Sequence, residues 1–158
     1  MTGTVTGGWA SILPRIATPT PSWACSRSYP GQPGQVAQAR AFLAYVLHDC
    51  PVADDAVLLC SELCANAVQY SESRRPRGQF ALHAKVCPGS WVWCGVEDEG
   101  GTWRKRPRDP ERMHGLDIVC AVTRGGWGIV EEARSRLVWY RLAWAAAGDA
   151  VPLLVLAS

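Results

Sequence analysis

Glu62 and Asn66 are the residues of this chain whose types and spacing could most directly do chemistry. Both lie in an apolar stretch that runs from Val57 to Val68, and residues four apart share one face of a helix. An Asn carbonyl oxygen is a hard ligand of the kind Mg²⁺ prefers, and a Glu one turn away could take a proton from a hydroxyl or a water. An ordinary helix with one solvent-facing polar stripe fits equally well. This segment alone leaves both interpretations open.

Two further segments place glycine beside an expected strand end and an expected helix start. The apolar run Trp91–Val96 favours a strand and leads into Asp98-Glu99-Gly100. A glycine there has no Cβ, so backbone could approach a flat ligand. Gly115 and Leu116 then open an apolar helical stretch, and a helix N-terminus of this kind suits an anion.

The order of these motifs resembles the GHKL ATPases, which have the histidine-kinase-like ATP-binding fold. Within that superfamily the chain is most similar to the small anti-sigma-factor serine kinases and their actinobacterial relatives. The segment Leu58–Ser71 has the family's S-E-L-x-x-N-A-V-x-x-S form, and Asp98-Glu99-Gly100 matches its D-x-G box. The resemblance covers roughly Ser22 to Leu142, most of the chain.

The resemblance implies ATP and Mg²⁺ as cofactors and a role for each motif. Glu62 would be the general base, acting on a Ser or Thr hydroxyl of a partner protein or on a water. The implied nucleotide-binding residues are Asn66, Asp98, Gly100, Gly115 and Leu116. Asn66 would hold Mg²⁺, and Asp98 would accept a hydrogen bond from the adenine amino group while Gly100 leaves the ring room.

Two boxes depart from the family's pattern. Met113 stands where the family usually has a glycine, next to His114, which we interpret as a lid surface residue. The late box, which usually carries a glycine and a small hydroxyl or Lys, appears here as Arg134-Ser135-Arg136. Arg136 could contact a phosphate as Lys would, although a planar guanidinium would do so with different geometry.

These features support two functions that the sequence does not separate. The first is an anti-sigma-factor-like serine/threonine kinase that phosphorylates an antagonist protein, and the intact Glu62–Asn66 pair favours it. The second is a non-catalytic nucleotide-binding module that sequesters a partner, which the departures at Met113 and in the late box favour. A histidine-kinase fragment is disfavoured because no helix with a phospho-acceptor His precedes the domain. The implied partners are a sigma factor, an antagonist protein, or both, and a homodimer is left open.

The composition limits the classes of protein to which this chain can belong. With 158 residues, 48% hydrophobic and 19% charged, the chain fits one globular domain. A net charge of +2 is too small to indicate a nucleic-acid or membrane partner. The seven cysteines include no Cys-x-x-Cys, so we expect free thiols in a reducing cytoplasm. The basic cluster Arg104–Arg106 with Arg108 would be a solvated loop or a lid that meets phosphates.

The sequence predicts three parts of the chain, and apolar periodicity predicts the order of helices and strands in the middle part. We expect a flexible lead over 1–21, a histidine-kinase-like ATPase domain over 22–144, and an apolar tail over 145–158. Helices are predicted over 36–47, 54–69 and 115–122, and strands over 80–86, 91–96, 127–131 and 136–144. Such blocks favour a two-layer α/β sandwich, the Bergerat-type ATP-binding fold, with a mixed, mostly antiparallel sheet.

Overall fold

A computed structural model describes residues 23–101 and 115–144 of the chain. The predicted lead 1–21, the tail 145–158 and the basic cluster 104–108 lie outside the described residues, as do Met113 and His114. The account that follows concerns the described part alone.

The elements follow the predicted order, with two additions, a first strand and a short 3-10 helix. They are β1 (Trp23–Pro30), α1 (Pro33–Val46), α2 (Ala53–Tyr70), the short 3-10 helix η2 (Glu72–Arg74), β2 (Gln79–Cys87), β3 (Trp91–Asp98), α3 (Gly115–Thr123), β4 (Trp127–Glu131) and β5 (Arg136–Ala143). Strand β1 was not predicted, because an edge strand that is mostly exposed carries little hydrophobic alternation. Among the described helices, none is both long and apolar enough to cross a membrane.

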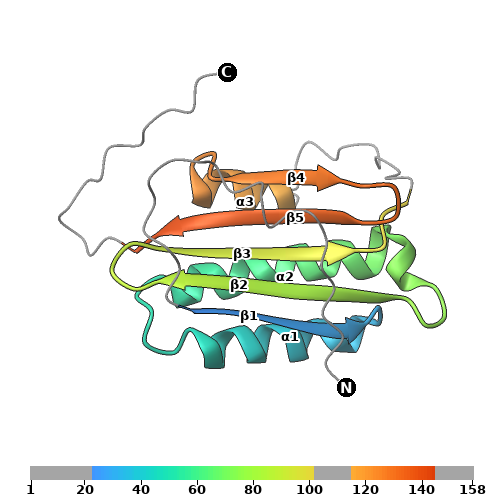
Figure 1. The fold of residues 1–158 in the computed structure, drawn as a ribbon, viewed down its shortest axis with the longest axis horizontal. Helices are drawn as coiled ribbons and strands as arrows, with labels where there is room; N and C mark the ends of the chain where they lie inside the picture. Colours follow the sequence, from blue (N-terminus) through green and yellow to red (C-terminus); the bar gives the residue numbers. More distant parts are fainter. Residues whose placement is uncertain (1–22, 102–114, 145–158) are drawn as a thin grey trace.

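One sheet in the order β1-β2-β3-β5-β4 forms the first layer, and the helices cover one of its faces (Figure 1). This confirms the two-layer α/β sandwich. The sequence allowed for a mixed sheet, but every described strand pair is antiparallel. The reason is the connection through α3, which returns the chain so that β4 runs in the direction of β3. The β4–β5 hairpin then places β5 between them, antiparallel to both.

The main hydrophobic core lies between the sheet and the helices. Strand β3 contributes Val92, Cys94 and Val96 to it, because alternate residues of a strand face the same side. Tyr140 on β5 joins the layers by donating a hydrogen bond to the carbonyl oxygen of Ala56 in α2, with an oxygen–oxygen distance of 2.5 Å. Burial raises the pKa of this phenol well above its ordinary value, so Tyr140 stays a neutral donor.

A second hydrophobic cluster lies on the opposite face of the sheet. Its buried members are Cys87, Trp91, Trp93 and Leu137. The Trp93 and Trp139 rings stack with centroids 6.4 Å apart, and the Lys85 ammonium lies 5.0 Å from the Trp93 ring centroid. Strand β3 is therefore apolar on both faces, which explains why its sequence is an almost unbroken apolar run.

Candidate functional site

Helix α2 places Glu62 and Asn66 at the border of its buried face. The core-facing residues of the helix include Leu59, Leu63 and Ala67, whereas Glu62 and Asn66 are each partly exposed. They are therefore neither core residues nor part of a fully solvated stripe. A partly exposed carboxylate and amide one turn apart remain available to a ligand while the rest of the helix holds them in place.

The start of α3 lies directly against Glu62. A Cβ atom built on Gly115 would come 2.6 Å from Glu62 Oε2, closer than real Cβ atoms approach their neighbours, and 3.2 Å from Glu62 Cβ, a tight contact. A larger residue here would have to displace the Glu62 carboxylate, so glycine lets the two helices approach without moving that side chain. Leu116, the next residue, packs against the main core and anchors the first turn of α3. The structure therefore brings together three predicted residues, Glu62, Gly115 and Leu116.

Asp98 ends β3 and folds back on the turn that follows it. Its Oδ1 accepts a hydrogen bond from the Gly100 backbone N–H at 2.7 Å. Gly100 adopts a φ of +66°, in the left-handed region that favours glycine. The Asp98 side chain is only 5% exposed and points to the helix-covered face, in line with Val96. Asp98 and Gly100 thus form one rigid turn at the end of a central strand.

Arg136 occupies the register position opposite Asp98, at the start of β5. Its Nη2 lies 3.3 Å from Asp98 Oδ1 and 3.2 Å from Oδ2, and both side chains are buried. Burial raises the pKa of the Asp98 carboxyl above its ordinary value, and the Arg136 charge and the Gly100 hydrogen bond only partly counter this. The sequence raised Arg136 as a phosphate contact, whereas the structure pairs it with the expected adenine acceptor.

Two serines that sequence reasoning missed tie α2 to this turn. Ser73 is fully buried; its hydroxyl donates to the Gln79 carbonyl at 2.6 Å and accepts from the Glu99 N–H at 2.9 Å. Ser71 donates to the Ala67 carbonyl at 2.7 Å and accepts from the Ser73 N–H at 3.0 Å. A Ser-x-Ser at the end of a helix is a signal of such local bonding.

These bonds place the two motifs at the same end of the sandwich. The Glu72 N–H donates to the Gly100 carbonyl at 2.9 Å, so the segment just after α2 touches the turn just after β3. In Figure 1, α2 and β3 end on the same side of the molecule. Asn66, one turn before the end of α2, and Asp98 therefore belong to one region of the structure.

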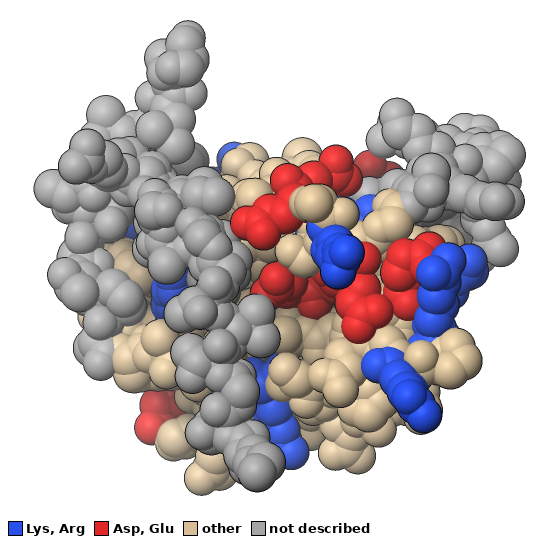
Figure 2. Space-filling model, turned by 45° about the vertical axis from the view of Figure 1, so that its right-hand side comes forward, with Lys and Arg blue, Asp and Glu red and all other residues tan. Residues whose placement is uncertain are grey.

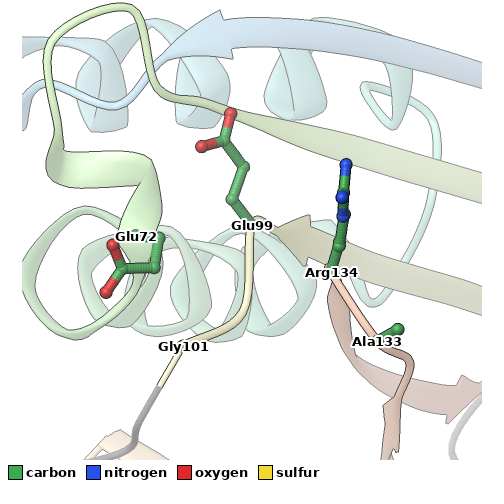
Figure 3. Close-up of a pocket in the computed structure, with 5 residues that line it drawn as sticks. All are labelled: Glu72, Glu99, Gly101, Ala133 and Arg134. Carbon is green, nitrogen blue, oxygen red and sulfur yellow. The ribbon is translucent and has the colours of Figure 1, made fainter.

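An open pocket of about 450 Å³ lies on the outer side of the same turn (Figure 3). It is lined by Glu72, Glu99, Gly101, Ala133 and Arg134. None of the predicted site residues lines it. Its volume would admit a small ligand, but two carboxylates beside one guanidinium would repel most phosphates. We therefore do not assign the nucleotide to this pocket.

The end of the sheet that carries this pocket is acidic. Figure 2 shows Asp and Glu side chains gathered at this end, with Lys and Arg among and beside them. The strand ends and loops there supply Glu72, Glu97, Glu99, Glu131 and Glu132. A phosphate among these carboxylates would be disfavoured.

Comparison with known proteins gives a likeness of fold. No protein-family model matches the chain, and neither does any curated protein. Among solved structures, the chain is similar to the RsbU and RsbW domains of Rv1364c from Mycobacterium tuberculosis, with a TM-score of 0.60 and 18% sequence identity. The match covers 77% of this chain and 32% of that chain. It shows that the two share a fold.

Proposed function

We propose that this chain binds ATP with Mg²⁺ and regulates a sigma factor by phosphorylating a Ser or Thr of an antagonist protein. The observation that carries the proposal is helix α2, on which Glu62 and Asn66 are partly exposed one turn apart. Glu62 lies against the start of α3, and Glu72, just after the helix, donates to the Asp98–Gly100 turn. The likeness to a structure that includes an RsbW domain supports the regulatory role.

The donor set fits Mg²⁺ that arrives with a nucleotide. The described residues contain no group of three or more His, Cys, Asp or Glu that could hold a metal ion. A bare divalent ion would therefore find no complete cage here. Mg²⁺ typically keeps its waters and phosphate oxygens and takes only one or two protein ligands. The Asn66 carbonyl oxygen would supply one, and the metal would offset phosphate charge.

The chain's own residues have distinct tasks in this proposal. Asp98 holds the base by accepting from its amino group, and Gly100 keeps the turn clear of side chain. Glu62 takes the proton from the attacking hydroxyl, and Gly115 allows the start of α3 to close on Glu62 without displacing it. Little covalent chemistry is asked of the protein, because phosphoryl transfer depends chiefly on positioning and electrostatics.

A second candidate function is a nucleotide-binding module that sequesters its partner without transfer. The buried Asp98–Arg136 pair favours it, because Arg136, the late-box residue that could have met a phosphate, is paired with Asp98 instead. Both candidates require nucleotide binding, and they differ in whether the partner becomes phosphorylated.

Calorimetry with ATP, with and without Mg²⁺, tests the shared step. We expect the protein to bind ATP and Mg²⁺ to strengthen binding. Asp98→Ala should weaken binding about tenfold or more, since an unpaired buried donor costs about 1–3 kcal/mol. Glu97→Ala, one residue away on the opposite face, is the matched control and should bind as the parent does. Equal affinity in the two variants would remove the adenine assignment.

A further inference from the structure

Arg136 lies beside the carboxylate that would bind the base, Asp98. Asp98 and Arg136 are register partners on adjacent strands, both on the helix-covered face. The guanidinium is a planar group with five N–H donors and no acceptor. A strong donor and a strong acceptor therefore stand side by side at the end of the central strands.

The geometry of the pair leaves Asp98 with acceptor capacity. One nitrogen, Nη2, lies near both carboxylate oxygens at 3.2 and 3.3 Å. A fork-like pair would instead use two nitrogens, at about 2.7–2.9 Å. A carboxylate offers about four lone-pair sites. Even with the Gly100 N–H bound to Oδ1, Asp98 can accept a further hydrogen bond on Oδ2.

Adenine presents the complement of this arrangement. Its amino group is a donor, and the neighbouring ring nitrogen N1 is an acceptor. We propose that Arg136 reads N1 of the adenine whose amino group Asp98 accepts, which makes Arg136 a specificity-determining residue. This inference rests on the proposed function, because it requires a nucleotide at Asp98. It assigns Arg136 to the base, at the opposite end of the nucleotide from the phosphates.

A change of single atoms in the ligand tests this directly. The compound 1-deaza-ATP keeps the amino group and lacks the N1 acceptor, whereas 7-deaza-ATP lacks an acceptor on the other edge of the base. We expect the unaltered protein to bind 1-deaza-ATP about tenfold or more weakly than ATP, because a buried charged donor would lose its partner. Binding of 7-deaza-ATP should stay within about twofold of ATP.

Substitutions then test whether Arg136 causes the preference for ATP over 1-deaza-ATP. Arg136→Met removes the donors and should bind ATP and 1-deaza-ATP alike, while Arg134→Met, in the adjacent exposed loop, should keep the preference. Should Arg136→Met fail to fold, Arg136→Lys keeps the charge and should show a reduced preference, since a single ammonium cannot serve both Asp98 and N1 equally well.

The outcomes separate the two proposals. If the unaltered protein binds ATP and 1-deaza-ATP equally, the role of Arg136 is overturned and nucleotide binding stands. Tighter ATP binding by Arg136→Met would also overturn it, because Arg136 would then compete with adenine for Asp98. No binding of ATP by the unaltered protein would overturn the proposed function and this inference with it.

Discussion

Glu97 and Asp98 are consecutive residues of one strand, yet their surroundings shift their pKa values in opposite directions. Glu97 faces away from the helices, where its Oε2 lies 3.2 Å from His83 Nε2, and this hydrogen bond lowers the pKa of Glu97 below its ordinary value. Asp98 faces the helices, where burial outweighs Arg136 and Gly100 and raises its pKa. The partners of Glu97 compensate for its burial, whereas those of Asp98 do not. Such a carboxyl group is a candidate for binding a ligand.

The two faces of the sheet differ in the same way. On the face opposite the helices, His83 links Ser26 on β1, at 2.7 Å from Nδ1, to Glu97 on β3. This chain of hydrogen bonds ties three neighbouring strands together, beside the second hydrophobic cluster. On the helix-covered face, the polar residues gather where elements end. We infer that the first set holds the sheet together and the second serves the site.

Glu62→Gln should produce the largest effect, a loss of phosphoryl transfer. It tests most directly whether the polar residues on the helix-covered face serve the site. The amide keeps the shape of the side chain but cannot take a proton, so phosphoryl transfer to a partner should fall about 10²–10⁴-fold with ATP affinity retained. Glu97→Gln makes the same chemical change on the other face and should leave transfer unchanged. Radiolabelled phosphate on a captured antagonist protein is the measurement.

If Glu62→Gln and Glu97→Gln lose phosphoryl transfer equally, the two faces of the sheet do not have separate roles. If phosphoryl transfer survives in Glu62→Gln, Glu62 is not the base. If the unaltered protein captures a partner in a nucleotide-dependent way but does not label it, the sequestering module is favoured.

The sequence predicted the elements well where the pattern was strong and less well where it depended on tertiary contacts. The helix that carries Glu62 and the strand that ends at Asp98 could be predicted, because long apolar runs bounded by polar residues define such elements. Strand β1 could not, since an edge strand is defined by its pairing with β2 rather than by its own residues. Likewise, nothing local relates Arg136 to Asp98: the two lie 38 positions apart and meet only through the register of β3 and β5.

Asp98→Ala should destabilise the fold more than Glu97→Ala. Asp98→Ala removes the acceptor of the Gly100 N–H and of the Arg136 guanidinium, and each buried donor left unsatisfied costs about 1–3 kcal/mol. On the other face Glu97→Ala removes the hydrogen bond between Glu97 and His83, so it should cost about 1 kcal/mol, the value of an ordinary hydrogen bond. Urea unfolding of both variants makes the comparison.

The double variant Asp98→Leu, Arg136→Met is the control for this explanation. It removes both charges and should recover most of the lost stability, since apolar replacements of buried ion pairs are often neutral. If it is as unstable as Asp98→Ala, shape rather than charge accounts for the loss.

The acid dependence of stability should give the smallest effect, with opposite signs for the two residues. The pKa of Glu97 is lowered on folding, so its contribution is present above the pKa of an unfolded Glu, about 4.3, and is lost as the pH falls through the folded value. The pKa of Asp98 is raised, so its contribution is present below the pKa of an unfolded Asp, about 3.9, and is lost as the pH rises through the folded value. Glu97→Gln should therefore reduce the fall in the free energy of unfolding between about pH 5 and 3, and Asp98→Asn should steepen it. Urea unfolding at a series of pH values measures both slopes, and slopes that change in the same direction would show that the two carboxyl groups have equivalent surroundings.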